Sequence, residues 1–416
     1  MNNLRLTQNN VFLSRNNRSL ASASTFSKVQ LFGAGKTPFC LEKGEGAYTW
    51  DVDGNKYIDY IIGLGCMTLG HNHPVVNDAI INQLNNGISF SLPTPVEIEV
   101  AEMLIERVPS AEMARFGKNG SDVTSAAVRV ARYYTGKDHI LFCGYHGWQE
   151  WYISQTSKKG GIPKHVGETS HRFTYNDIDS ISSLIRQYKD NVACIIMEPV
   201  SKEWPVDNFL EKVRDIATKN NIILIFDEIV TGFRFHKAGI QVLLDVEPDM
   251  SCFSKAIANG MPLSVLLGRP DIMSKFNGDI FFSLTNAGET LSLAAAKAVI
   301  KFYDEVDVIS HIARNGKKLK DGLEHLIVRH GLFDRMKIIG FDCRFGIAFI
   351  NKDIQGYDST DDLVYWTKLV TSHGILSGGW HMISYAHTDD IIEETLQRYD
   401  NILPVMKERL VAGHER

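Results

Sequence analysis

The sequence lacks the features that mark nucleic-acid-binding, membrane and secreted proteins. Its formal net charge is only -5 over 416 residues, which gives no electrostatic argument for nucleic acid or an anionic membrane as a partner. No apolar run approaches the roughly 20 residues that span a bilayer. The N-terminal stretch has no continuous apolar core of the kind found in secretory signals. We therefore expect a cytoplasmic protein without nucleic-acid or membrane partners.

Cysteine is sparse as well. The six cysteines are scattered along the chain and form no CxxC pair. This pattern predicts free thiols in a reducing compartment rather than a disulfide framework. Cys143, Cys194 and Cys252 lie in apolar runs, so we expect these three thiols to be buried.

Several phosphate and metal motifs begin but are incomplete. "FGAGKTP" contains a GKT, but Gln30 stands upstream of it where a phosphate-binding P-loop needs glycine; "GLGCMT" has Thr68 where a dinucleotide fingerprint needs glycine. His71 and His73 are two residues apart with no further ligand set nearby, which indicates a turn rather than a metal site. We expect no bound metal.

The sequence does contain strand-like apolar runs that alternate with helical patterns. Helices are predicted at 178–189 and 208–219 because apolar residues recur there with a period near 3.6. Such alternation predicts an α/β fold with a mostly parallel sheet covered on both faces. The strand-like runs are "HILFC" 139–143, "VACIIM" 192–197, "IILIF" 222–226, "MSCF" 250–253 and "LSVLL" 263–267.

The two ends of the chain predict a smaller α+β domain. Residues 26–62 alternate short apolar runs with turn residues and predict a meander, with "VDGN" as a hairpin turn. After about residue 305 the pattern starts helical, then predicts strands near 336–350 and a final helix near 389–409. We predict four segments: a flexible arm 1–25, the first part of the small domain 26–75, a large domain 76–304 and the rest of the small domain 305–416.

Three of the apolar runs end in ionisable residues. Glu198 follows "CIIM", Asp227 follows "LIF", and Lys255 follows "MSCF" after one serine. Each alone would simply mark where a buried strand meets water. Because the carboxyl ends of parallel strands meet at one edge of a sheet, where ligands bind, the three together indicate a functional site.

Two further motifs point to the same edge. Gly120 and Ser121 begin an amphipathic helix whose free N–H groups could hold a phosphate, although an ordinary helix cap is the simpler alternative. Tyr145 and His146 lie on a glycine-flanked turn, where an aromatic ring could cover a flat ligand or merely pack a loop. The predicted apolar face of the helix consists of Val123, Ala126, Ala127, Val130, Ala131 and Tyr134.

Several spaced motifs carry a family resemblance. "NGSDV", "GYHGW", "IIMEPV", "FDEIVTGFR", "FSKAIANGMP" and "LTNAGETLSLAAA" occur in the order seen in class III aminotransferases. The resemblance covers about residues 30–400 and implies fold type I, the fold of aspartate aminotransferase, with pyridoxal 5′-phosphate (PLP) as cofactor. "LGHNHP", "ISFSLPT" and "AHTDDIIEETL" also resemble the glutamate-1-semialdehyde 2,1-aminomutase branch.

The resemblance gives each candidate residue a role around the cofactor ring. Lys255 would bind PLP covalently as a Schiff base and later shuttle a proton, work that a partly desolvated amine performs well. Asp227 would pair with the pyridine nitrogen so that the ring serves as an electron sink. Ile229 and Tyr145 would cover the two ring faces.

The remaining roles concern the phosphate and its surroundings. Backbone N–H groups of Gly120 and Ser121 would hold the phosphate, and His146 and Glu198 would lie near the cofactor. Thr285 matches a threonine that reaches the phosphate from the second subunit, so the resemblance implies a homodimer with active sites at the subunit interface.

Departures from the aminomutase pattern suggest a different substrate. The segment before the first strand lacks the arginine that binds the substrate carboxylate in the aminomutase, and Lys28 is the nearest cation. Asn119 stands where the family usually has serine, and Glu289–Thr290 where it usually has Asn-Pro.

We therefore expect an aminotransferase that converts PLP to pyridoxamine phosphate. It would move an amino group from an amino acid donor, glutamate, to an aldehyde or ketone, with sugar derivatives among the candidates. Two alternatives remain open: an intramolecular aminomutase, and a non-catalytic regulator that has kept the PLP fold.

Overall fold

The chain divides into two units, Pro74–Ile309 and Met1–His73 with Ser310–Arg416. The computed structural model describes residues 4–20, 24–27, 37–278, 280–350 and 359–412. Lys28 and Gln30, singled out in the sequence, lie outside the described residues. All the residues proposed for the site belong to the unit Pro74–Ile309.

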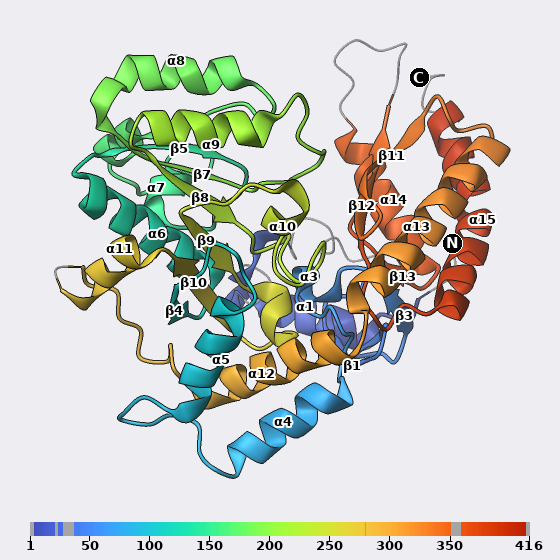
Figure 1. The fold of residues 1–416 in the computed structure, drawn as a ribbon. Coiled ribbons are helices and arrows are strands. Elements are labelled where there is room, and N and C mark those ends of the chain that lie inside the picture. The colour runs from blue at the N-terminus through green and yellow to red at the C-terminus, as the bar shows by residue number, and fades with distance from the viewer. Residues whose placement is uncertain (1–3, 21–23, 28–36, 279, 351–358, 413–416) are drawn as a thin grey trace. The chain divides into compact units, whose positions relative to one another are not determined.

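A seven-stranded sheet forms the centre of this unit (Figure 1), with strand order β4-β10-β9-β8-β7-β5-β6. Pairing is parallel from β9 to β6, and β10 runs antiparallel to both of its neighbours. The mostly parallel sheet predicted from the sequence is thus confirmed. The strands are β4 (Met113–Gly117), β5 (His139–Cys143), β6 (Ser170–Arg172), β7 (Val192–Met197), β8 (Ile223–Asp227), β9 (Met250–Phe253) and β10 (Ser264–Gly268).

Helices cover both faces of this sheet. Helix α6 lies on one face, and α8 and α9 pack on the other (Figure 1). The unit's helices are α4 (Pro74–Leu84), α5 (Pro95–Ile105), α6 (Gly120–Thr135), α7 (Glu150–Ile153), α8 (Ile178–Tyr188), α9 (Phe209–Lys219), α10 (Gln241–Leu244), α11 (Pro270–Met273) and α12 (Thr290–Glu305), with 3₁₀ turns η2 (Lys164–Thr169), η3 (Lys189–Asn191), η4 (Lys255–Ala258) and η5 (Ser274–Asn277).

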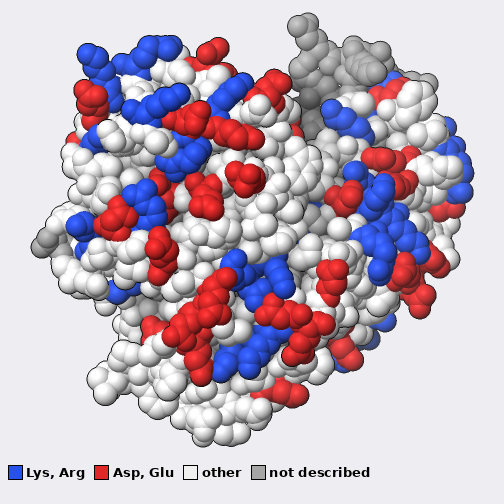
Figure 2. All heavy atoms as spheres, in the orientation of Figure 1, with Lys and Arg blue, Asp and Glu red and all other residues white. Residues whose placement is uncertain are grey.

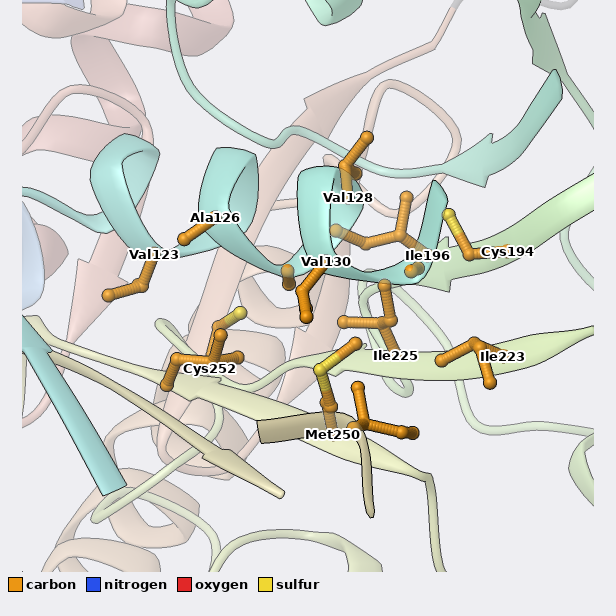
Figure 3. Packing of buried hydrophobic residues seen from close by; sticks show 14 of the residues in the cluster. Val123, Ala126, Val128, Val130, Cys194, Ile196, Ile223, Ile225, Met250 and Cys252 are labelled. Atoms are coloured by element: carbon orange, nitrogen blue, oxygen red, sulfur yellow. The ribbon is translucent and has the colours of Figure 1, made fainter. Parts of the chain in front are cut away.

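Strand residues alternate between two hydrophobic clusters, as the period of two requires. Ile196 and Ile225 face the cluster under α6, whereas Ile195 and Leu224 face the cluster under α8 and α9. Figure 3 shows Val123 and other α6 side chains directed at the strands of the first cluster. Because both faces of the sheet are packed against helices, the positions of the strands are fixed, and so is the edge at which they end.

Two expectations about burial were wrong. Tyr134 lies on the predicted apolar face of α6 but is 37% exposed, because it reaches the surface near the helix end, where its hydroxyl donates to Asp271 Oδ2 at 2.6 Å. Cys143 is only partly buried, because it is the last residue of β5 and lies at the open edge of the sheet. Cys194 and Cys252 are buried as expected.

The other unit contains two small sheets and its own helices. The order β1-β2-β3-β13 includes the predicted meander, with the "VDGN" turn between β2 and β3, and the second sheet has the order β11-β12-β14. The elements are α1 (Thr7–Ser19), β1 (Leu41–Glu45), β2 (Tyr48–Asp51), β3 (Lys56–Asp59), α3 (Ile62–Gly65), β11 (Met336–Phe341), β12 (Arg344–Phe349), α14 (Thr360–Ser372), β13 (Ile375–Leu376), β14 (Trp380–Met382) and α15 (Asp389–Ala412); α13 (Val308–Arg329) begins at the boundary of the units.

Two surface properties bear on the expected partners. No helix within the described ranges combines the length and hydropathy that crossing a bilayer requires. On the face drawn in Figure 2, acidic and basic side chains are interspersed rather than segregated by sign.

Two fully buried histidines make the unit that contains residues 310–416 sensitive to acid. His381 stacks on Phe345 with ring centroids 4.7 Å apart, and His387 stacks on Tyr60 at 4.5 Å. Burial is the main cause that lowers the pKa of His381 to about 3 and that of His387 to about 4, from an ordinary value of 6.5. Both rings are therefore neutral in the folded protein at neutral pH.

We predict that the stability of this unit falls as the pH drops below about 6.5. The unfolded chain takes up protons there while both buried rings stay neutral, so each histidine lowers the free energy of unfolding by about 1.4 kcal/mol per pH unit, down to the folded pKa. Urea unfolding at pH 7, 6 and 5 measures this slope. His381→Phe should make it shallower, and His325→Gln, a change at an exposed histidine, should leave it unaltered. An unchanged slope in His381→Phe would contradict the assignment.

Candidate active site

The carboxyl edge of the large sheet gathers the predicted ionisable residues. Cys143 pairs with Met197 across β5 and β7, and Met197 pairs with Phe226 across β7 and β8. Asp227 pairs with Cys252 of β9. The chain therefore leaves these four strands at one level, and the residues that follow each strand meet there.

The innermost pair at this edge is Asp227 and His146. His146 Nδ1 lies 2.8 Å from Asp227 Oδ2, and its Nε2 lies 3.1 Å from the carbonyl oxygen of Cys143. Both side chains are buried, at 2% exposure for Asp227 and 1% for His146. Each ring nitrogen of His146 therefore faces an oxygen that can accept a hydrogen bond, the Asp227 carboxylate on one side and the Cys143 carbonyl on the other. The imidazole thus holds one oxygen of the Asp227 carboxylate. Because the carboxylate is rigid, the direction of its second oxygen is set as well.

The neighbouring residue Glu228 explains why Asp227 points this way. Successive strand residues face opposite sides of a sheet. Glu228 is fully buried on the other side, where it accepts hydrogen bonds from Thr231 Oγ1 at 2.5 Å and from Ile240 N at 2.9 Å. Burial raises the pKa of Glu228 despite these donors. Its role is structural: it anchors the following loop so that Asp227 stays directed at His146.

Tyr145 and Glu198 lie beside this pair. The backbone N–H of Tyr145 donates to Glu198 Oε1 at 2.8 Å, which ties the loop after β5 to the end of β7. The Tyr145 side chain is 63% exposed. Burial of its hydroxyl and the nearby Asp227 carboxylate raise the pKa of Tyr145. An exposed aromatic face therefore stands close to a buried carboxylate.

Lys255 begins η4, separated by one residue from the end of β9, in a strained backbone conformation. Its φ is +49°, in the left-handed region that non-glycine residues rarely adopt. The next three residues, Ala256, Ile257 and Ala258, are at most 1% exposed and hold the turn in place. Ser254 Oγ donates to the Leu263 carbonyl at 2.7 Å on the other side. Strain that is held so firmly is typical of functional sites.

The start of α6 has the shape of an anion cup. Asn119, rather than Ser121, is the N-cap, and Asn119 N donates to Asp122 Oδ2 at 2.7 Å. A Cβ on Gly120 would lie 2.5 Å from Ile229 Cδ1, so a larger residue here would displace the Ile229 side chain from its present position. Residues Gly120 and Ser121 therefore occupy the first turn, whose N–H groups and dipole favour an anion.

The loop after β5 closes against this cup. Gly147 has a φ of +106°, and a Cβ there would lie 2.5 Å from Ser121 Cβ. Thr124 Oγ1 donates to the His146 carbonyl at 2.9 Å, which fastens the same loop to α6. The aromatic turn predicted from "GYHGW" is thus seated on the helix that the sequence singled out.

The structure brings together eight of the nine predicted residues at this edge, although His146 reaches the site through Asp227. Thr285 differs, because it is an exposed residue of the turn before α12, and no hydrogen bond within the described residues joins it to Gly120 or Ser121. That turn is nevertheless tied to the cup: Glu289 Oε1 lies 2.7 Å from Lys118 Nζ, with both side chains largely buried.

Sequence reasoning missed the Lys118–Glu289 pair. Glu289 caps α12 by accepting from Leu291 N at 2.9 Å and Ser292 N at 3.0 Å. Burial works to raise the pKa of Glu289, but Lys118 and Ser292 together hold it below its ordinary value. The Glu289–Thr290 sequence, where the family usually has Asn-Pro, was a signal that this position is unusual. It did not identify Lys118 as the partner of Glu289, because the two residues are 171 positions apart in the chain.

Comparisons with known proteins agree with this geometry. The model of the family described as aminotransferase class-III matches residues 31–357. This chain belongs to the class III aminotransferase family. A 3-aminobutyryl-CoA aminotransferase from Cloacimonas acidaminovorans (strain Evry) is 34% identical over 388 residues, which cover 91% of this chain and 92% of that protein.

Solved aminotransferases share the fold. The FumI protein of Sphingopyxis sp. MTA144, solved in its PLP internal aldimine form, has a TM-score of 0.89 at 26% identity and covers 97% of this chain and 98% of its own. An omega-transaminase from Sphaerobacter thermophilus has a TM-score of 0.85 at 24% identity, with 96% and 98% covered. Fold type I is therefore confirmed, as is PLP as the cofactor of the family to which the chain belongs.

The residues present fit PLP. The ring nitrogen needs a fixed carboxylate, which Asp227 provides at 2% exposure. A flat ring needs two covering side chains, and both the exposed face of Tyr145 and the Ile229 side chain lie at this edge. The phosphate needs a helix N-terminus without side-chain obstruction, which Gly120 supplies.

We predict that Glu289→Ala lowers the free energy of unfolding by about 1–3 kcal/mol, because α12 loses its cap and Lys118 loses a largely buried partner. Urea unfolding measures the loss. Glu289→Gln, which can still accept from the helix N–H groups, should lose less. In a Lys118→Met background the cost of Glu289→Ala should shrink, since the charge left unpaired is gone. Equal costs in both backgrounds would show that the ion pair contributes nothing.

Proposed function

We propose that this protein is a PLP-dependent aminotransferase in which Lys255 and Asp227 act on opposite sides of one cofactor ring. The buried Asp227–His146 pair, at the same sheet edge as the strained Lys255, is the observation that supports this most strongly. A surface ion pair would not need a carboxylate buried to 2% exposure and locked by an imidazole. We also propose that the unit Pro74–Ile309 is the cofactor-binding domain.

Each residue would have a defined task toward the bound cofactor. PLP supplies an electron sink that stabilises negative charge on the carbon next to the substrate nitrogen. Asp227, oriented by His146, would keep a proton on the ring nitrogen. The Lys255 amine would take a proton from the substrate carbon and return it to a neighbouring atom. Gly120 and Ser121 would bind the phosphate through backbone N–H groups, and Tyr145 and Ile229 would exclude water from the ring faces.

For the substrates, we propose an amino acid donor, glutamate, and a small carbonyl acceptor. The sequence departures from the aminomutase leave an aldehyde, a ketone or a sugar derivative as acceptors. The relative from Cloacimonas, 34% identical, adds a second class, because its name places the amino group on the third carbon of an acyl-CoA. A panel of 3-oxo thioesters, keto sugars and semialdehydes with glutamate as donor separates these classes by kcat/KM.

The aminomutase is the second candidate function. It is supported by the motifs shared with that branch, and it differs from a transaminase in needing no external donor. Turnover of one amino substrate without release of a keto acid would favour it.

The six cysteines, all free, support our proposal that the protein works in a reducing compartment, the cytoplasm.

We predict that Lys255→Ala abolishes multiple turnovers, because the variant lacks the amine that we propose moves the proton. Borohydride reduction followed by peptide mass analysis should find the cofactor attached at Lys255 in the parent protein and no attachment in the variant. Lys237→Ala, at an exposed ion pair in the same unit, serves as the control and should keep full activity. Steady turnover by Lys255→Ala would refute the proposal, and a parent protein that never takes up PLP would favour the non-catalytic regulator.

We further predict that the active site needs Thr285 from a second subunit. Thr285→Glu should repel the phosphate and, like Lys255→Ala, give an inactive protein by itself. Co-expression of the two variants with different tags gives mixed dimers. Each mixed dimer would keep one intact site if Thr285 acts across the interface, so activity should return. Inactive mixed dimers would show that Thr285 serves the site of its own chain, and a fully active Thr285→Glu protein would show that it serves no site.

A further inference from the structure

Tyr152 occupies an unusual place behind the candidate site. It lies in α7, in the segment after Gly147, and is only 5% exposed. Besides its chain neighbour Trp151, its ring meets three other aromatic rings edge to face: Phe142 at 5.5 Å and 73°, Tyr145 at 5.5 Å and 83°, and His146 at 5.6 Å and 80°. Phe142 belongs to β5, so the cluster is anchored in the sheet.

Two of these three partners are the residues that face or hold the proposed cofactor ring. Tyr145 presents the exposed aromatic face, and His146 fixes the Asp227 carboxylate. Edge-to-face geometry is the arrangement that aromatic rings prefer, and it resists rotation of either ring. One side chain therefore restrains the tilt of the ring above the site and of the imidazole beside it.

The backbone around these residues makes such support necessary. Gly144 and Gly147 flank Tyr145 and His146 with φ values of +109° and +106°, so the loop has glycine at both ends. Trp151, the neighbour of Tyr152, stacks on His146 at 5.9 Å and 20° and donates from Nε1 to Ser125 Oγ of α6 at 3.0 Å. Helix α7 thus places two aromatic side chains against a turn whose flanking glycines restrict its backbone conformation only weakly.

We propose that Tyr152 is a positioning residue that sets the orientation of Tyr145 and of the Asp227–His146 pair together, and thereby the fit of PLP. This inference rests on the proposed function. It extends that function to a residue outside the predicted site, one that acts through two others rather than by touching the cofactor.

The contribution of the Tyr152 ring to positioning can be tested separately from that of its hydroxyl group. Burial raises the pKa of Tyr152, and the Arg172 guanidinium opposes that rise, so the hydroxyl lies within reach of a cation. Arg172 also stands over the Phe142 ring, 5.6 Å from its centroid. If positioning comes from ring packing, Tyr152→Phe should rescue what Tyr152→Leu loses.

The test compares variants of the full-length protein by titrating the apo-form with PLP and recording the visible circular dichroism of the bound cofactor. Tyr152→Leu should weaken PLP binding about tenfold, as expected for the loss of two aromatic contacts, and should reduce the dichroic band. Tyr152→Phe should stay within about twofold of the parent. Tyr152→Met, whose flexible side chain fills the space, serves where leucine impairs folding, and should behave like Tyr152→Leu.

The matched control is Tyr188→Leu. Tyr188 stacks on His171 at 3.9 Å beside the first residue of β5, at the opposite end of that strand, so its loss costs a comparable aromatic contact far from the site. It should leave PLP affinity and dichroism unchanged. In a Tyr145→Leu background, the effect of Tyr152→Leu should shrink, because part of its action passes through Tyr145.

The possible results distinguish a failure of the positioning role of Tyr152 from a failure of the proposed function. Parent protein that binds PLP through Lys255, with Tyr152→Leu indistinguishable from it, would overturn the positioning role alone. Equal losses in Tyr152→Leu and Tyr188→Leu would also overturn it, since they would report general destabilisation. Parent protein that fails to bind PLP would overturn the proposed function and this inference together.

Discussion

The buried hydrogen bond between His146 Nδ1 and Asp227 Oδ2 is the constraint around which the rest of this site is built. A carboxylate at 2% exposure is costly to bury unless its oxygens are satisfied. Here one oxygen meets the imidazole, and the other accepts from Ile229 N at 3.2 Å. The loop after β5 and the turn after β8 each supply one of the two groups that bond to this carboxylate.

The same constraint explains the division of labour between adjacent acidic residues. Asp227 ends strand β8 and Glu228 follows it; the two are chemically alike, but the pleat sends them to opposite sides. Glu228 binds backbone N–H groups of its own loop and becomes part of the scaffold, whereas Asp227 retains a defined direction toward the site. Position in the pleat, rather than residue type, thus directs one carboxylate into the scaffold and the other toward the site at which we propose chemistry.

How much the sequence predicts depends on how local each signal is. Asp227 and Lys255 could be found because each ends a buried apolar run, and parallel strands must end at one edge. The amphipathic start of α6 was visible for a similar reason. Lys118 and Glu289 were missed because a salt bridge between residues so distant in the chain leaves no periodic trace. The burial of Tyr134 was predicted wrongly because helical periodicity identifies the face of a helix but does not show that a residue near the helix end reaches the surface.

The left-handed backbone at Lys255 has a consequence for the evolution of this protein. A side chain with a Cβ is disfavoured at a φ of +49°, whereas glycine or asparagine adopts that conformation at little cost. The fold itself would therefore gain from losing its lysine. Under the proposed function, a relative that lost catalysis would gain stability by replacing this residue, whereas an active enzyme would have to keep the lysine.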